Sequence, residues 1–410
     1  MGEGHRRILS ECGGSLNHVR PSGGPYRILV VLRWLGGIRT FCRYVYGKFD
    51  RERFEYTLMA PDTEDIRYLL EDLQGLKVRF LPVPCDPSFA QLSYRMVAWE
   101  ICRGKYDLVH SHGFTAGTFC AVPSKLRRIP HVMTNHDVFS EAQFQNGKGI
   151  LRKLFLEANL PAIRVIHNVS FGAKENLLRH IRTLRPLEKK LIVIPNGIEV
   201  ERFQEDKVRN LRGELGLPRN TFLIGFLGRF MSQKGFRYLV GALEILRKDT
   251  GLPAIPVVIA VNDGGFVREE KESVRSRGLE EQVRFLPFVP DPAATIKGLD
   301  VVAMPSLWEA CGLLSMEAMV SGIPFIGSDV EGLREFLENT PARSVAPADE
   351  VALAHAIRAE MLQPSKQMAQ DFSLEAARRF DVRKQARELE RLFTELAEER
   401  RSCNRGFTQS

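Results

Sequence analysis

The sequence predicts an α/β protein made of two doubly wound parallel sheets in tandem, facing one another across an interdomain cleft. Its 410 residues exceed what one hydrophobic core usually organises, so two domains are expected. Short runs rich in β-branched residues alternate with longer segments of helical period. These short runs are almost continuously apolar, as strands are when helices cover both faces of a parallel sheet.

The first series of elements occupies residues 26–198. Its predicted strands are Ile28–Leu32, Phe54–Ala60, Lys77–Pro82, Asp107–His110, His131–Asn135, Arg164–His167 and Leu191–Ile194. Its predicted helices are Ile38–Lys48, Ser88–Arg103, Phe114–Leu126 and Ile150–Asn159. Residues 1–25 are rich in Gly, Ser, Pro and Arg without periodicity, and this predicts a flexible leader.

A second series occupies residues 199–380, after a boundary punctuated by Pro195, Asn196 and Gly197. Its predicted strands are Phe222–Leu227, Pro256–Val261, Val283–Leu286, Val301–Met304 and Pro324–Ile326. Residues 381–400 form a charged helix with one apolar face that can dock. Residues 401–410 are expected to be a loose tail.

Composition excludes several classes of protein. Apolar residues make up 44% and charged residues 26%, which argues against wholesale disorder, collagen-like repeats and a pure coiled coil. No apolar run reaches the length of a membrane span, and the first residues lack the apolar centre of a secretory signal, so a cytoplasmic location is expected. The seven cysteines are scattered without a Cys-x-x-Cys pair, which indicates neither a disulfide framework nor a zinc site.

The net charge of +8 is concentrated in the first half, where residues 1–200 carry 29 Lys and Arg against 19 Asp and Glu. Nucleic acid, an anionic membrane surface, phosphorylated substrates and a merely solvated surface are all compatible with that excess. A nucleic-acid-binding protein is disfavoured, because no recognised binding module or interleaved aromatic and basic stripe is present.

Ligands of open parallel sheets bind at the carboxyl ends of the strands, so the strand-to-helix loops should carry the chemistry. Gly36 and Gly37 follow the first strand, where glycines let backbone N–H groups approach a phosphate, or serve turn geometry alone. His112 and His136 follow the fourth and fifth strands, and each could bind a sugar hydroxyl or a phosphate, or merely pack in its loop. His110, on the strand itself, is expected to pack.

Two cations and two carboxylates stand out in the second half. Arg229 and Lys234 flank a strand-to-helix turn and could converge on a diphosphate, although ordinary surface charge would look the same. Glu309 follows a strand, and Glu317 lies in the next helix, whose first-turn amides suit a diphosphate. The two carboxylates could accept hydrogen bonds from hydroxyls of a sugar and a ribose.

This pattern resembles the retaining, nucleotide-sugar-dependent glycosyltransferases of the GT-B fold, of the group 1 or family 4 type. The resemblance is carried by the Glu-x7-Glu motif Glu309…Glu317, followed by Ser321-Gly322-Ile323-Pro324 and Glu331-Gly332-Leu333-Arg334-Glu335. It implies a Rossmann-like acceptor domain at 26–198, a Rossmann-like nucleotide-sugar domain at 199–380, and a helix at 381–400 that crosses back to the first domain.

The resemblance also implies site residues. Arg229 and Lys234 would hold the donor diphosphate and stabilise the departing nucleotide, Glu309 would bind hydroxyls of the donor sugar, and Glu317 would hold the ribose. Donor contacts from backbone are implied at one glycine of the first domain and at the start of the helix after Glu309. These residues are Gly37, Gly312, Leu313 and Leu314, while His112 would contact the transferred sugar near its reacting face.

Two departures from the family pattern are visible. Cys311 stands where an aromatic residue is usual, and residues 261–265 are an irregular version of the family's Gly-x-Gly loop. No Asp-x-Asp metal motif and no placed nucleophile are evident, so the resemblance implies metal-independent transfer by same-face attack, without a cofactor.

The function expected from the resemblance is transfer of a sugar, from a UDP-sugar or alternatively GDP-mannose, to a hydroxyl acceptor in cell-envelope glycan synthesis. Acceptor recognition is expected in the basic first domain, where Arg39 and Arg43 fall one turn apart on a helix beside the cleft. Arg152 and Lys153 lie beside Leu151, Leu154 and Phe155, and together these residues suggest a lipid-linked or polysaccharide acceptor and peripheral contact with the inner membrane face. A nucleotide-sugar epimerase, a sugar phosphorylase and a non-catalytic relative are the alternatives.

Overall fold

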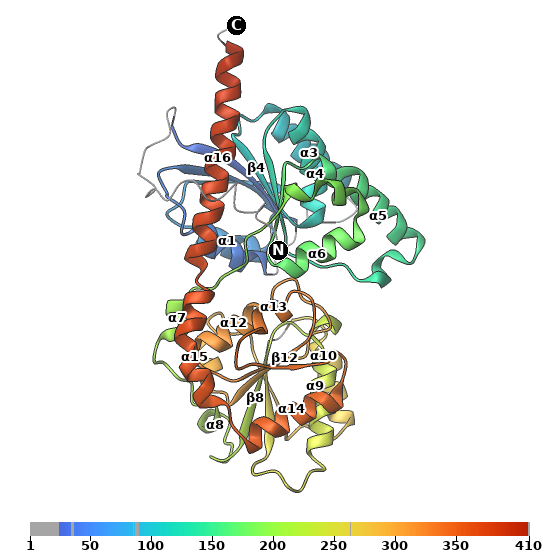
Figure 1. The fold of residues 1–410 in the computed structure, drawn as a ribbon, viewed down its shortest axis with the longest axis vertical. Helices are drawn as coiled ribbons and strands as arrows, with labels where there is room; N and C mark the ends of the chain where they lie inside the picture. The colour runs from blue at the N-terminus through green and yellow to red at the C-terminus, as the bar shows by residue number, and fades with distance from the viewer. Residues whose placement is uncertain (1–23, 34–36, 85, 87–89, 263, 409–410) are drawn as a thin grey trace.

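The computed structural model describes residues 24–33, 37–84, 86, 90–262 and 264–408. These residues form two all-parallel sheets, drawn one above the other in Figure 1 with helices around each. The first sheet has the order β3-β2-β1-β4-β5-β6-β7, and the second has the order β10-β9-β8-β11-β12-β13. The predicted fold class, two doubly wound Rossmann-like units, is therefore confirmed.

The strands agree closely with the sequence prediction. Those of the first sheet are β1 (Tyr26–Val31), β2 (Phe54–Pro61), β3 (Val78–Val83), β4 (Leu108–His112), β5 (His131–Asn135), β6 (Val165–Asn168) and β7 (Leu191–Val193). Those of the second are β8 (Phe222–Leu227), β9 (Pro256–Val261), β10 (Val283–Leu286), β11 (Val301–Met304), β12 (Phe325–Ser328) and β13 (Arg343–Val345). Only β13 was not predicted, because its three residues, Arg343, Ser344 and Val345, include two polar side chains and form no apolar run.

The helices cover both faces of each sheet. In the first domain they are α1 (Ile38–Tyr46), α2 (Glu64–Asp72), α3 (Ala90–Arg103), α4 (Gly113–Leu126), α5 (Gly147–Asn159) and α6 (Phe171–His180). After the linker come α7 (Val200–Gln204), α8 (Leu211–Glu214), α9 (Phe236–Leu246), α10 (Val267–Ser276), α11 (Ala293–Lys297), α12 (Leu313–Val320), α13 (Arg334–Leu337), α14 (Glu350–Leu362), α15 (Lys366–Arg379) and α16 (Val382–Thr408).

The chain crosses between the domains twice, and the two crossings pair with each other. The Ile198 N–H donates to the Phe380 carbonyl at 2.8 Å, and the Val382 N–H returns the bond to Ile198 at 3.0 Å. Gly197 leaves no room for a side chain here, since an added Cβ would lie 2.6 Å from the Val382 Cα. Both crossings are therefore held as one double-stranded hinge.

The last helix, α16, runs up the side of the first domain in Figure 1. It buries Leu389 and Phe393 in the apolar cluster of β1 and α1. The helix continues through residue 408, so the expectation of a loose tail from residue 401 is wrong for 401–408. Arg401 explains part of the difference, because its guanidinium pairs with Asp107 at 2.8 Å and also donates to the Pro25 carbonyl at 2.6 Å. The expected leader lies outside the described residues up to position 23.

The domains meet beside the loop that contains Glu309. The Ser170 hydroxyl donates to the Ala310 carbonyl at 2.6 Å, and the Gly172 N–H donates to Glu335 at 2.9 Å. Val138, which follows β5, packs in the same apolar cluster as Ala310. The loops at the carboxyl ends of both sheets thus face each other, as ligand sites of such sheets require.

Candidate active site

Glu309 and Lys234 form the central ion pair of this junction. Lys234 Nζ lies 2.7 Å from Glu309 Oε1, and the glutamate is only 5% exposed. The two loops are joined a second time, because the Gln233 side chain donates to the Trp308 carbonyl at 2.9 Å. A buried carboxylate needs such a cation, since an unpaired charge in this position would be costly.

A glycine determines how closely the Lys234 loop approaches the loop after β11. Gly235 has φ +69°, and a Cβ there would lie 1.9 Å from the Pro305 carbonyl oxygen. Only glycine satisfies both conditions. Arg229, at the other end of the loop, is exposed and has no carboxylate partner in the part of the chain that the structure describes. Its guanidinium is therefore available to an anion.

The start of α12 differs from the expectation of three free amides. The Gly312 N–H donates to the Gly332 carbonyl at 3.2 Å, and the Leu313 N–H donates to Cys311 at 3.1 Å. The Leu314 N–H has no backbone partner among the described residues. The positive end of the helix still points into the junction, but only Leu314 offers an unused donor without rearrangement.

Glu317 lies on α12 against the first domain. Burial raises the pKa of its carboxyl group to about 7, while the cations Arg202 and Arg43 oppose that shift. Tyr44 of α1 is a close neighbour, and burial together with the charge of Glu317 raises the pKa of its hydroxyl. The negative charge of the ionised Glu317 carboxylate is therefore only partly offset by these cations, and hydroxyl donors from a ligand would stabilise it.

Replacing Glu317 with Gln should make the unliganded protein more stable at alkaline pH. A carboxyl group with a raised folded-state pKa binds its proton more tightly when folded, so stability is lost as the pH rises from about 4.5 through 7. Glu317→Gln has no carboxyl group at this position and does not lose stability in this way. The difference in free energy of unfolding between the variant and the parent protein should therefore shift in the variant's favour by up to about 3 kcal/mol between about pH 5 and about pH 8. Urea unfolding of both proteins at the two pH values measures the gain. A difference independent of pH would contradict the buried carboxylate.

His112 is the last residue of β4 and is 2% exposed, whereas the sequence placed it just past the strand. Its Nε2 lies 2.9 Å from the Tyr46 hydroxyl, and its Nδ1 lies 2.9 Å from Nε2 of His136. Both ring nitrogens are thus occupied by protein groups. His136 lies further out and is partly exposed.

His112 belongs to a chain of hydrogen bonds whose far end is a backbone carbonyl. His167 Nε2 lies 2.8 Å from the Ile194 oxygen, which can only accept, so the proton of His167 is on Nε2. Its Nδ1 then accepts from Thr134 at 3.0 Å. The Thr134 oxygen in turn accepts from Nε2 of His110 at 2.7 Å. The Ile194 carbonyl therefore sets the direction of the first three hydrogen bonds, from His167 through Thr134 to His110.

The directions of the remaining hydrogen bonds follow in the same way, because each neutral imidazole has one donor and one acceptor nitrogen. Nδ1 of His110 accepts from the Tyr46 hydroxyl at 2.6 Å, and the Tyr46 oxygen accepts from Nε2 of His112. Nδ1 of His112 accepts from Nε2 of His136, which leaves the lone pair on Nδ1 of His136 at the outer end. Burial lowers the pKa of His136 to about 3, so its ring is neutral. A carbonyl cannot take up a proton, so the chain orients groups and does not relay protons out of the site.

Removing the Tyr46 hydroxyl should break this chain in the middle. Tyr46→Phe leaves His110 without a donor and His112 without an acceptor, which should lower the free energy of unfolding by about 1–3 kcal/mol. Long-range 15N NMR of the imidazoles reads the tautomers directly. The unmodified protein should show His112 protonated at Nε2, and the variant should show a mixture. A His112 protonated at Nδ1 in the unmodified protein would refute the chain.

The remaining expected positions are placed as follows. Gly37 precedes α1 in the right-handed region with φ −65°, and an added Cβ would meet nothing within 4 Å. Gly36 lies outside the described residues. Cys311 packs against the interdomain cluster with Val138. Asn262 in the irregular loop accepts from the Gly264 N–H at 2.7 Å, which ties that loop back on itself.

Two family models match this chain, "Glycosyl transferases group 1" over residues 207–379 and "Glycosyltransferase Family 4" over residues 35–202. A glycosyltransferase of Methanocaldococcus jannaschii is 30% identical over 75% of this chain and 80% of its own length. The chain belongs to the group 1, family 4 glycosyltransferases.

Two further proteins are similar to this glycosyltransferase. The UDP-Gal:alpha-D-GlcNAc-diphosphoundecaprenol alpha-1,3-galactosyltransferase of Escherichia coli is 26% identical over 74% of this chain and 79% of its own length. The crystal structure of Anabaena HepE in complex with UDP-glucose has a TM-score of 0.74 at 22% identity, and covers 90% of this chain and 99% of the other. The latter likeness shows the GT-B fold.

Several residues of the candidate site were not found by sequence reasoning. Tyr46, Thr134 and His167 complete the histidine chain, and their only signal is a histidine near the end of each of three neighbouring strands. Arg202, whose charge acts on Glu317, lies on the short helix α7 at the start of the second domain, where no motif marks it. Among the described residues, no group of three His, Cys, Asp or Glu side chains could hold a metal ion.

Proposed function

We propose that this glycosyltransferase transfers a hexose from a UDP-sugar to a hydroxyl group of a lipid-linked or polysaccharide precursor, with retention of anomeric configuration. The observation that carries the proposal is the Lys234–Glu309 pair, with the exposed Arg229 on the same loop as Lys234 and the unused Leu314 amide at the start of the helix after Glu309. Two cations and a free amide suit a diphosphate, and a buried carboxylate suits sugar hydroxyls. The E. coli relative, whose name specifies a UDP-galactose donor and a diphosphoundecaprenol acceptor, supports this substrate class.

In the proposed reaction, the bond between the anomeric carbon and the diphosphate breaks as the acceptor oxygen attacks from the same face. The acceptor proton passes to the leaving phosphate oxygen, and the nucleoside diphosphate departs. Arg229 and Lys234 stabilise the negative charge that grows on the diphosphate, which is where electrostatic catalysis has its largest effect. Glu309 orients the sugar through its hydroxyls, and Glu317 accepts from the ribose.

The histidine chain gives the first domain a defined acceptor of hydrogen bonds in this reaction. His136, whose Nδ1 has no protein partner among the described groups, would accept from a hydroxyl of the sugar or of the attacking acceptor. His112 would then act by positioning His136 rather than by direct contact, which revises the role implied by the resemblance. Because both rings are neutral, neither serves as a strong base.

Thermal unfolding with UDP, GDP, ADP and their sugars tests the donor. A nucleotide that binds only the folded protein, at a hundredfold excess over its Kd, adds about 2.7 kcal/mol of stability. UDP and UDP-sugars should stabilise the protein, and Arg229→Ala should abolish the effect. Stabilisation by GDP-mannose alone would show that the donor is GDP-mannose and not a UDP-sugar. Sugar-nucleotide isomerisation without an acceptor would favour an epimerase, and no response to any nucleotide would favour a non-catalytic relative.

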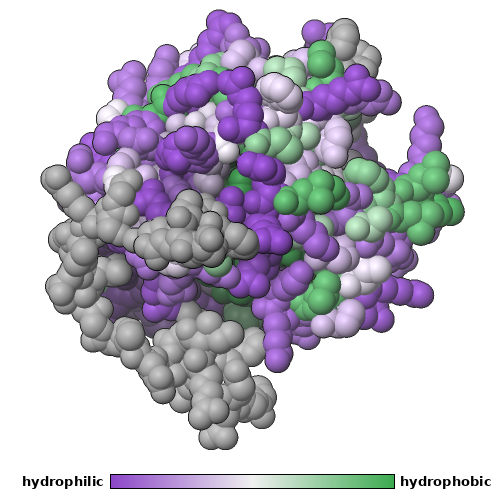
Figure 2. Space-filling model, turned by 90° about the horizontal axis from the view of Figure 1, so that it is seen from above, coloured by the Kyte–Doolittle hydropathy of each residue, from purple (hydrophilic) through white to green (hydrophobic). Residues whose placement is uncertain are grey.

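We also propose that α5 lies against an anionic membrane surface. Leu151 is 68% exposed, Leu154 56% and Phe155 52%, and they share the helix with Arg152 and Lys153. Figure 2 shows hydrophobic surface gathered at the right-hand edge, the side on which α5 lies in Figure 1. No described helix is long and apolar enough to cross a membrane. Apolar side chains beside cations suit a helix that lies in the interface.

Vesicle sedimentation tests this surface. Phosphatidylglycerol vesicles should retain the protein at low salt, and Leu151→Glu with Phe155→Glu should reduce retention at least about tenfold, because both burial and charge attraction are lost. The matched control is Met368→Glu with Leu374→Glu on α15, which are 57% and 64% exposed. Equal losses in the two double variants would refute the role of α5.

A further inference from the structure

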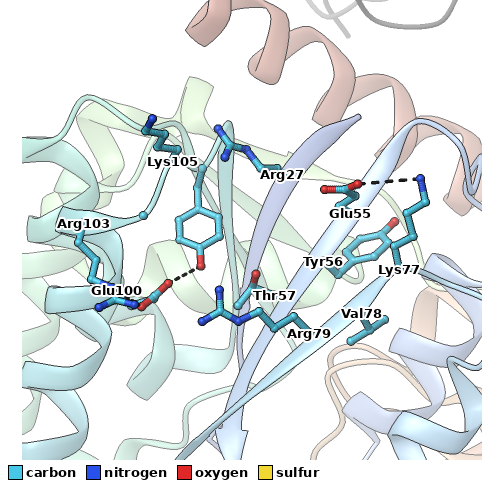
Figure 3. Close-up of a pocket in the computed structure, with 12 residues that line it drawn as sticks. Arg27, Glu55, Tyr56, Thr57, Lys77, Val78, Arg79, Glu100, Arg103 and Lys105 are labelled. Carbon is cyan, nitrogen blue, oxygen red and sulfur yellow. Dashed lines mark hydrogen bonds and ion pairs between the residues drawn. The ribbon is translucent and has the colours of Figure 1, made fainter. Parts of the chain in front are cut away.

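A second hollow lies at the amino ends of β1, β2 and β3, at the edge of the first sheet opposite to the candidate active site. Its volume is about 540 Å³, and its walls come from the starts of these strands, the end of α3 and the turn before β4 (Figure 3). This size lies within the range of small-molecule sites in proteins. All strands are parallel, so the hollow is separated from the cleft by the length of the sheet.

The walls of this hollow carry more positive than negative charge. Their two carboxylates are already engaged: Glu55 lies 3.9 Å from Lys77, and Glu100 lies 3.3 Å from Arg103 and also accepts from Tyr106 at 2.6 Å. The other three charged groups are cations with no carboxylate within ion-pair distance among the described residues. They are Arg27, Arg79 and Lys105.

Sheet geometry places two of these cations, Arg27 and Arg79, on the same face of the first sheet. Arg79 is the register partner of Thr57, and Arg27 is the register partner of Glu55, two residues earlier on the same strand. Residues two apart on a strand point to the same face, so both guanidinium groups lie on the face that α3 covers. Figure 3 shows Arg79 and Arg103 reaching toward the same carboxylate, Glu100. The hollow thus has three cations without a carboxylate partner among the described residues, and their positive potential would attract an anion.

We propose that this hollow binds a phosphate-bearing ligand with at least two negative charges. Guanidinium groups form paired hydrogen bonds with phosphate oxygens, and Lys105 adds a mobile point charge. Two sources share this chemistry, a free polyphosphate compound and an anionic lipid headgroup. A lipid headgroup could reach the hollow from a membrane surface, because Arg103 lies one turn from Trp99, an aromatic side chain that is 66% exposed on α3. The proposal concerns a site apart from the donor cleft and does not depend on the proposed reaction.

Calorimetric titration of the full chain with inorganic tripolyphosphate at low salt tests the site. The titration is made in the Arg229→Ala protein, so that binding in the donor cleft does not contribute. Adding Arg79→Gln and Lys105→Gln should weaken binding at least about tenfold, as expected when two charge-assisted contacts are lost. The matched control adds Lys207→Gln and Arg219→Gln, two exposed cations of the second domain, and should change the Kd less than about twofold.

Sedimentation with phosphatidylglycerol vesicles identifies the source. If the Arg79 and Lys105 changes weaken tripolyphosphate binding but leave vesicle retention unaltered, the ligand is a free phosphate compound. If they reduce both, the ligand is a lipid headgroup. Melting temperatures close to that of the parent protein would show that the exposed substitutions leave the fold intact. Equal effects of the hollow pair and the control pair on tripolyphosphate binding would overturn the proposal.

Discussion

Lys234→Met should lower kcat/KM for sugar transfer about a thousandfold, the loss expected when a charge that stabilises a leaving group is removed. The same change should reduce the free energy of unfolding by at least about 2 kcal/mol, because it leaves Glu309 charged and unpaired in a position only 5% exposed. Steady-state kinetics with a UDP-sugar and urea unfolding measure the two losses separately.

A second substitution separates stability from catalysis. Glu309→Gln added to Lys234→Met removes the unpaired charge, so the double variant should recover most of the lost stability. Under the proposed function its activity should stay low, because the diphosphate would still lack the Lys234 cation and the sugar would lack the Glu309 carboxylate. If activity returned together with stability, Lys234 would be a structural partner of Glu309 and no more.

Gly37→Ala should give the opposite combination, a fold at least as stable as the parent and a large loss of activity. The φ of −65° at Gly37 suits alanine, and a Cβ would meet nothing within 4 Å, so folding should gain about 0.4–1 kcal/mol. If the donor phosphate approaches this backbone, a methyl group occupies its place. We expect kcat/KM to fall about a hundredfold, mainly through KM, which corresponds to roughly 2.7 kcal/mol of lost binding.

Gly235→Ala is the contrasting control. Its positive φ and the 1.9 Å approach to Pro305 predict a loss of stability for structural reasons, with or without ligand. Melting curves and kinetics of both glycine variants therefore distinguish a glycine kept for a ligand from a glycine kept for the fold. Unchanged kinetics in Gly37→Ala would exclude close approach of the donor to α1.

The fold could be predicted from the sequence because its signals are local. Nearly continuous apolar runs such as Pro256–Val261 specify buried parallel strands, and glycine and proline residues mark the turns between these strands and the helices. The carboxyl ends of those strands then predict where ligands bind, and the pair Glu309 and Glu317 predicts donor binding in the second domain. These inferences need only the residues within one element and its adjoining loop.

The partners of those residues could not be predicted, because they come from positions distant in the chain. Pairing of Lys234 with Glu309 joins loops 75 residues apart, and the pKa of Glu317 is raised by burial and opposed by Arg202 of α7 and Arg43 of α1, which tertiary packing brings near α12. The sequence indicated His112 as a contact residue, yet its two nitrogens are taken by Tyr46 and His136.

Hydrogen-bond direction and burial are properties of the packed interior, so only the tertiary structure decides them. Local pattern therefore determined the two sheets and the sheet edge at which the candidate site was expected. Packing between distant segments decided which amides are free, which carboxylate carries a raised pKa, and that the outer end of the histidine chain is His136.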